Sequence, residues 1–129
     1  MDFLGKRPKP AQSTTTRGQQ AEDAALAYLQ RQGLRLIERN YRTAGRGGGE
    51  IDLILRDRDG SLVFVEVRSR NTGRYGGAGG SIGTTKQGRI VLAARHYLAR
   101  LAAPPPCRFD VVLLEGAELQ WLKAAFDAQ

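Results

Sequence analysis

Two apolar segments joined by a short connection constrain the fold of this chain more than any other feature. Glu50–Arg56 and Leu62–Arg70 both alternate side chains with the period of a β-strand. Between them, Arg58-Asp59-Gly60 has the length and final glycine that are typical of a three-residue hairpin loop. The two segments are therefore expected to form an antiparallel β-hairpin.

The loop also predicts which residues face each other across the hairpin. If Asp57 and Ser61 flank the loop, Asp52 lies opposite Glu66. Opposite residues point to the same face, so two acids would meet there, and like charges at that distance repel. A divalent cation between them would remove the repulsion, and Mg²⁺ prefers carboxylate oxygens. The register thus suggests a metal site held by Asp52 and Glu66.

Strict alternation divides the first strand of the hairpin into two faces. These are Ile51, Leu53 and Leu55 on one side, and Glu50, Asp52 and Ile54 on the other. An ordinary alternative stays open at this point. The polar face would then meet solvent, and Glu50 and Arg68 would form a cross-strand ion pair.

The rest of the chain alternates between helical and strand-like patterns. Helices are expected at about residues 16–32 and 85–101, and further strands at about 34–42, 108–114 and 118–123. This order, αβββαββ, predicts an α/β sandwich in which two main helices flank a mixed sheet of about five strands. Residues 1–17 are expected to be a disordered basic tail, and residues 18–129 a single domain.

Composition narrows the class of partner and the compartment. The 129 residues include 20 Lys and Arg against 13 Asp and Glu, a net charge of +7. That excess favours a polyanion, nucleic acid before acidic lipid, although a basic protein with no such partner is the alternative. Cys107 is the only cysteine, which fits a reducing compartment. No apolar run is long enough to cross a bilayer, so a cytoplasmic protein with no membrane partner is expected.

Several short motifs occur together in a characteristic order. They are Gly18-x-x-x-Glu22, Gly49-Glu50-Ile51-Asp52-Leu53-Ile54, Phe64-Val65-Glu66-Val67-Arg68-Ser69-Arg70, Lys86, and Arg108-Phe109-Asp110-Val111-Val112. Over about residues 16–123 the sequence closely resembles the YraN-like bacterial family. That resemblance implies a restriction-endonuclease-like fold, similar to that of archaeal Holliday-junction resolvases.

The resemblance also implies roles for individual residues. Glu22 would be an outer acid, and Asp52 and Glu66 would hold Mg²⁺ or Mn²⁺. Without the resemblance, Glu22 would be read as a solvated acid near a helix N-terminus. Arg68 stands where nucleases of this fold usually have lysine. Arginine cannot shed its proton, so Arg68 would be a poor general base but could bind phosphate.

Two further basic features could serve a nucleic-acid site. Lys86, at the start of the second helix, could supply the missing amine, or could simply be an exposed first-turn lysine. The glycine-rich loop at residues 73–83 carries Arg74 and Tyr75, a cation and a ring suited to a nucleic-acid strand. An ordinary mobile linker is the alternative for this loop.

Three functions therefore remain open from the sequence. The first is a Mg²⁺-dependent endodeoxyribonuclease acting on branched or structured DNA, with DNA favoured over RNA. The second is a nucleic-acid-binding protein that keeps the fold but cleaves poorly because of Arg68. The third is a non-catalytic scaffold. The oligomeric state is open from the sequence; a homodimer is one candidate, by analogy with resolvases, since a junction offers two symmetric strands to cut.

Overall fold

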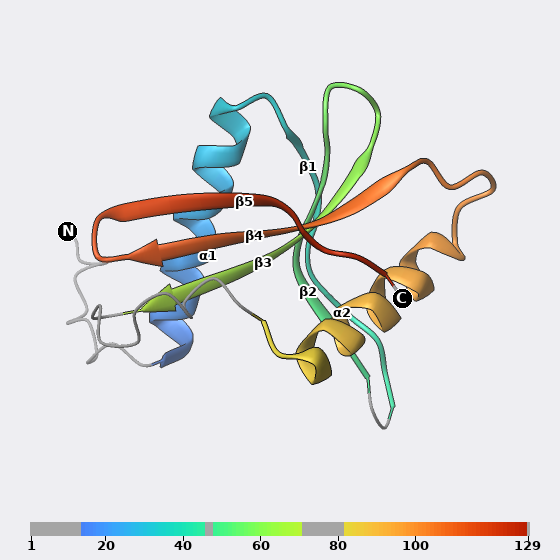
Figure 1. Ribbon diagram of the computed structural model, residues 1–129, viewed down its shortest axis with the longest axis horizontal. Coiled ribbons are helices and arrows are strands. Elements are labelled where there is room, and N and C mark those ends of the chain that lie inside the picture. Colours follow the sequence, from blue (N-terminus) through green and yellow to red (C-terminus); the bar gives the residue numbers. More distant parts are fainter. Residues whose placement is uncertain (1–13, 46–47, 71–81, 129) are drawn as a thin grey trace, which may run out of the picture.

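The fold is a five-stranded mixed sheet with one helix on each face. The computed structural model describes residues 14–45, 48–70 and 82–128. In chain order these form α1 (Thr14–Arg31), β1 (Arg35–Arg42), β2 (Glu50–Arg56), β3 (Leu62–Arg70), α2 (Thr84–Leu98), β4 (Cys107–Glu115) and β5 (Glu118–Phe126) (Figure 1). The predicted α/β class and the order αβββαββ are confirmed.

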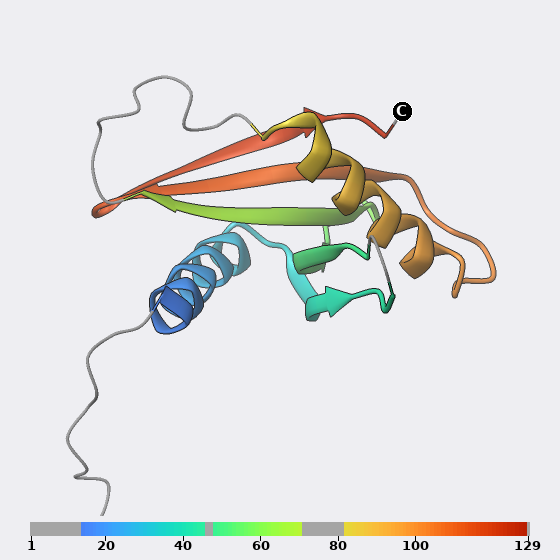
Figure 2. The ribbon, with the colours of Figure 1, turned by 90° about the horizontal axis from the view of Figure 1, so that it is seen from below.

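The strands lie in the sheet in the order in which they occur in the chain. β3 and β4 are parallel, whereas the other neighbouring pairs are antiparallel. A parallel pair cannot be joined by a tight turn, so α2 makes the crossover between β3 and β4. Figure 2 shows α1 and α2 on opposite sides of the sheet.

Each helix closes its own apolar core against one face. On the α1 side, Ala25 and Leu29 of the helix pack with Leu53, Leu55, Val63, Val65 and Val112 of the sheet. On the α2 side, Ile90, Ala93, Ala94 and Tyr97 pack with Ile51, Ile54, Leu62, Phe64, Phe109 and Val111. Because β2, β3 and β4 contribute to both cores, they are the interior strands of the domain.

The hairpin register is confirmed where β2 and β3 pair. Ile54 lies opposite Phe64, and the ladder runs from the loop as far as Leu53 and Val65. Gly60 has a φ of 92°, the left-handed conformation expected at the end of this loop. Asp52 is therefore the first residue of β2 beyond its ladder with β3.

Strict alternation along β2 is wrong at Ile51. This residue packs in the α2-side core together with Ile54, whereas Leu53 packs on the α1 side. The change of face falls at Asp52. Across β1, the residue between the partners of Leu53 and Ile51 is Asn40, whose φ is 53°. Asparagine tolerates this left-handed conformation, and Asn40 lies beside the point where the ladder between β2 and β3 ends.

Element ends differ from the sequence expectation by a few residues. α1 begins at Thr14, inside the segment expected to be a tail. α2 ends at Leu98 rather than near 101, because the chain tightens into a turn in which Leu101 N–H donates to the carbonyl of Leu98. β5 continues to Phe126, which pairs with Phe109 beyond an irregularity in the ladder. No described helix is long and apolar enough to cross a membrane.

Gly49 sets how closely α2 approaches the start of β2. A Cβ atom at this position would overlap the backbone carbonyl of Arg89 and crowd Ala93. We expect Gly49→Ala to lower the free energy of unfolding by about 1–3 kcal/mol, as overpacking does elsewhere. Denaturant titration would measure this.

Gly88 provides the matched control for that substitution. It lies within α2, and no described atom is within 4 Å of a Cβ built there. Gly88→Ala should raise stability by about 0.5–1 kcal/mol through helix propensity. Equal effects of the two substitutions would contradict the close approach at Gly49.

Candidate active site

Asp52 lies where β2 separates from β3. Its Oδ2 accepts a hydrogen bond of 2.8 Å from the backbone N–H of Val67. Within a regular antiparallel ladder, a β3 amide facing β2 would donate to a backbone carbonyl. Here the carboxylate of Asp52 is the acceptor, and this bond orients the side chain towards β3.

Glu66 comes from β3 beside Asp52 and is buried. Besides burial, its negative charge raises the pKa of Asp52, so the two carboxyl groups are close neighbours. Lys86 Nζ, in the first turn of α2, lies 3.5 Å from Glu66 Oε2. The two acids predicted from the hairpin register are therefore in contact, with an amine alongside.

Burial and mutual repulsion shift the titration of this pair. Burial, followed by the negative charge of Glu66, raises the pKa of Asp52 to about 8. Burial also raises the pKa of Glu66, against the opposing effects of the positive charges of Lys86 and Arg68. Two carboxyl groups in such contact share protons as a unit. The pair thus retains a proton at neutral pH unless a cation replaces it.

Glu22 reaches the same region from α1. Its side chain is only 14% exposed, and Oε1 lies 3.3 Å from Nη2 of Arg39 on β1. Its charge contributes to raising the pKa of Asp52, so the two side chains are neighbours. Glu22 is therefore neither a solvated acid nor remote from the pair.

The two candidate cations approach Glu66 from different elements. Arg68 follows it on β3, close enough that its charge helps to oppose the rise in the pKa of Glu66. Lys86 is 46% exposed and still contacts the carboxylate, so it is more than a solvated first-turn lysine. Glu50 forms its ion pair with Arg42 of β1, at 3.6 Å.

Two predicted contributors lie outside the described residues. Arg74 and Tyr75 belong to the segment 71–81, as does most of the loop at 73–83. The predicted tail also lies largely outside, because the description starts at Thr14. Glu22, Asp52, Glu66, Arg68 and Lys86 are the predicted site residues that the fold brings together.

The chemistry of the donors decides what kind of metal site is feasible. In the described part of the chain, no three His, Cys, Asp or Glu side chains are grouped tightly enough to enclose an ion. Two carboxylates, Asp52 and Glu66, are nevertheless a sufficient protein contribution for Mg²⁺, which usually keeps several water ligands and binds phosphate oxygens. The residues therefore fit a site that shares its ion with a phosphorylated substrate.

Sequence reasoning missed Arg39 as a partner of the site. Its Nη2 lies 3.3 Å from Glu22 and 2.9 Å from the neighbouring Asp23. Arg39 stands opposite Leu53 on β2. Because Leu53 packs on the α1 side of the sheet, Arg39 also points to that side and reaches the helix. No local pattern in the sequence signals this contact.

Sequence reasoning also left the partner of Asp110 unnamed. Asp110, fully buried on β4, accepts hydrogen bonds from Arg108 Nε at 3.1 and 3.2 Å. Trp121 Nε1 and the N–H of Ala124 each donate to it at 2.9 Å. Arg108 in turn contacts Asp57 beside the hairpin loop at 2.9 Å. This network joins the hairpin loop to β4 and β5, and Asp110 pairs with Val65, the residue before Glu66 on β3.

The fold and the site together define a class of protein. It is an α/β domain with a mixed five-stranded sheet, carrying a buried pair of acids where two central strands separate. The chain belongs to the uncharacterised protein family UPF0102, whose family model matches residues 21–114. The resemblance to the YraN-like family, which is this family, is thereby confirmed.

Similar proteins cover almost the whole chain. A UPF0102 protein of Acidovorax sp. (strain JS42) is 68% identical over 131 residues, 99% of each chain. One from Verminephrobacter eiseniae (strain EF01-2) is 63% identical and covers 100% of this chain and 98% of its own. One from Paracidovorax citrulli (strain AAC00-1) is 71% identical over 92% of this chain and 89% of its own.

Proposed function

We propose that this protein binds nucleic acid and hydrolyses its phosphodiester bonds with the help of a divalent metal ion, as an endonuclease. One observation carries the proposal. Asp52 and Glu66 are neighbours in a largely buried position and each raises the cost of the other's charge, with the cations of Lys86 and Arg68 beside them. Paired acids with raised pKa values beside basic groups are typical of functional sites.

A purely structural role explains this pair poorly. Two buried acids in contact destabilise a fold unless they are neutralised. A divalent ion held by Asp52 and Glu66 would neutralise them, polarise a phosphate and lower the pKa of bound water. Mg²⁺ suits such oxygen ligands, and Mn²⁺ can occupy similar sites.

The chain's own residues would supply the remaining functions. Arg68 presents a planar guanidinium that can hold a phosphate through two parallel hydrogen bonds. Lys86 Nζ can lose or regain a proton, which the guanidinium cannot. Glu22, held by Arg39, adds negative charge beside Asp52 and so favours a cation there. The amine that restriction-endonuclease-like nucleases usually have where Arg68 stands would thus come from α2.

Charge and family resemblance support the choice of substrate. The net charge of +7 favours a polyanion. The likeness to restriction-endonuclease-like resolvases favours branched or structured DNA over RNA. A binding protein with little turnover is the second candidate, and the presence of arginine at position 68 favours it.

Cleavage assays would test the proposal directly. We expect branched, single-stranded or duplex DNA to be cut in the presence of Mg²⁺ or Mn²⁺, and the Asp52→Ala/Glu66→Ala double variant to lose that cutting. Chelator in place of metal is the control for the wild type. If wild type and double variant behave identically, the endonuclease proposal fails. Metal-independent binding of DNA without cleavage would support the second candidate.

Lys86→Arg separates charge from proton transfer at Nζ. If Lys86 only stabilises negative charge, the arginine variant should cleave at nearly the wild-type rate. We expect instead a loss of about 100-fold, within the range of general acid–base catalysis, together with a changed pH profile. Arg35→Lys, at an exposed position at the start of β1, is the control for exchanging the two cations and should leave the rate unchanged.

A further inference from the structure

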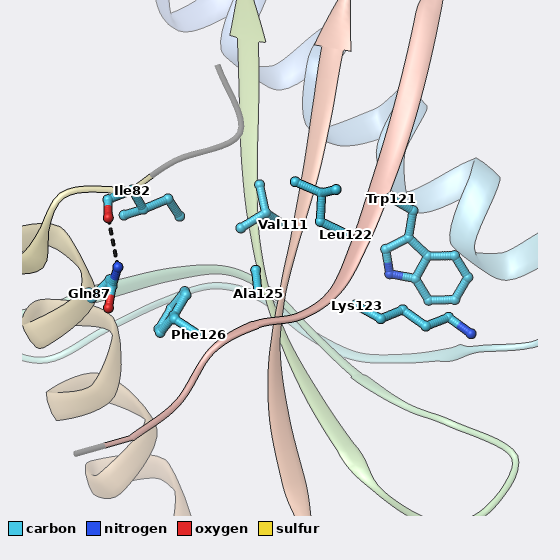
Figure 3. A pocket seen from close by; sticks show the side chains of 8 residues that line it. All are labelled: Ile82, Gln87, Val111, Trp121, Leu122, Lys123, Ala125 and Phe126. Atoms are coloured by element: carbon cyan, nitrogen blue, oxygen red, sulfur yellow. Dashed lines mark hydrogen bonds between the residues drawn. The ribbon is translucent and has the colours of Figure 1, made fainter. Parts of the chain in front are cut away.

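A pocket around β5 lies next to the candidate active site; Ile82 and Gln87 line it from the α2 side, whereas Trp121 packs towards α1. It has a volume of about 510 Å³ and extends from the start of α2 to the end of β5. In Figure 3, Ile82, Gln87 and Phe126 stand on one side and Trp121 and Lys123 on the other. Val111 and Leu122 lie between them. This volume lies within the range of pockets that take small organic groups.

The sheet register connects the pocket to Glu66. Glu66 pairs with Val111 on β4, and Val111 pairs with Leu122 on β5. The pocket floor therefore continues the same row of residues, and Leu122 is about 10 Å from Glu66 at the usual spacing of strands. In α2, Lys86 contacts Glu66 and the next residue, Gln87, lines the pocket. A strand of nucleic acid bound at Glu66 and running towards β5 would cross this pocket.

The lining has the chemistry to hold a nucleobase. Gln87 Nε2 donates to the carbonyl of Ile82 at 2.7 Å, and in Figure 3 the amide oxygen lies on the opposite side, next to Phe126. That oxygen can accept an N–H from the edge of a base. Phe126, stacked on Phe109 at a centroid distance of 5.0 Å, offers a ring that is fixed in place. An aromatic ring and an amide are the groups by which proteins hold unpaired bases.

We propose that this pocket binds an unpaired nucleobase of the strand held at Asp52 and Glu66. The inference rests on the proposed function and names its substrate class. A base inside a duplex is stacked and paired, and extracting it costs several kcal/mol. The substrate is therefore nucleic acid with a single-stranded segment beside the bound phosphate, such as a free strand or a branch point. Lys123, on the far rim, would contact its backbone.

The test compares strands that differ only in their bases. A labelled deoxyadenosine oligonucleotide and an abasic strand of equal length carry the same phosphates, and binding to the full chain is measured with chelator at one salt concentration. We expect wild type to bind the base-bearing strand about tenfold more tightly, the scale of one stacked base. Gln87→Ala and Phe126→Leu should each bring that ratio towards one while binding the abasic strand as wild type does.

Leu92→Ala is the matched control, because Leu92 is exposed on α2 and lines a separate, neighbouring pocket. It should leave the ratio unchanged. A wild-type ratio of one, or a ratio that neither pocket variant changes, would overturn the base pocket. If metal-dependent cleavage persists in that case, the proposed function survives. If neither strand binds, the base pocket fails, and the cleavage assay with branched and duplex DNA decides the proposed function separately.

Discussion

Asp52→Asn is expected to stabilise the metal-free protein at pH 8 and to lower its metal-dependent activity strongly. Burial and the charge of Glu66 raise the pKa of Asp52 to about 8 in the folded state, from a reference value of 3.8. Between these values the folded state binds more protons than the unfolded state, so its stability falls as pH rises. Asparagine has no charge to bury, and it can still accept the hydrogen bond from Val67 N–H.

Denaturant titration in chelator would measure this effect. Near pH 4 wild type and Asp52→Asn should have similar free energies of unfolding. By pH 8 the free energy of unfolding of the variant should exceed that of wild type by about 1–3 kcal/mol, the cost of a buried polar group that lacks a partner. Asp127→Asn, an exposed acid near the C-terminus, should show no such gain. If the variant were less stable than wild type at pH 8, a charged Asp52 would not be unfavourable in the folded protein, and this prediction would be wrong.

The same substitution should have the opposite effect when metal is present. Mg²⁺ or Mn²⁺ should raise the melting temperature of wild type, because a ligand that binds only the folded state stabilises it. Asp52→Asn should lose most of this shift and, if the protein is a nuclease, about 100-fold or more in cleavage rate. Such a trade of stability for activity is typical of functional sites. Equal metal-induced shifts in both proteins would contradict the assigned ligands.

Asp110→Ala is expected to be the most damaging single substitution for the fold. The side chain is 0% exposed and accepts hydrogen bonds from Arg108, Trp121 and Ala124. Its removal would leave a guanidinium N–H, an indole N–H and a backbone N–H without their acceptor. Arg108 would retain Asp57, so we expect a loss of about 3–4 kcal/mol, within the range for breaking a buried ion pair.

That loss would be a large part of the total stability of a domain of this size. Denaturant titration and the yield of folded protein would both report it. Asp110→Asn keeps acceptor capacity and should lose less. The double variant Arg108→Met/Asp110→Leu removes both members of the ion pair, so no buried guanidinium is left without its acceptor. It should therefore recover part of the stability. A loss below about 1 kcal/mol in Asp110→Ala would show that the network contributes little.

Much of the architecture could be predicted because it follows from local patterns. The loop Arg58-Asp59-Gly60 has a glycine that can adopt positive φ, and this determines the pairing of Ile54 with Phe64. From that register alone, Asp52 and Glu66 were expected to be neighbours. The order of helices and strands likewise follows from periodicity and turn residues. These signals act over a few residues, so they can be read without the rest of the fold.

The break in alternation at Asp52 could not be predicted in this way. Ile51 and Leu53 would share a face in a regular strand, but they pack in different cores. The cause lies between elements. β2 separates from β3 beyond Leu53, and Asn40 on β1 adopts positive φ. Packing against two different helices overrides the local period.

The sequence by itself therefore determined the α/β class, the hairpin register and the meeting of two acids. Only the tertiary structure decided how those acids are held: Val67 N–H binds Asp52, Lys86 reaches Glu66, and Glu22 approaches from α1. These contacts join segments far apart in the chain. They depend on where the strands separate and on how the helices pack against them. Neither can be predicted from the pattern within a single segment.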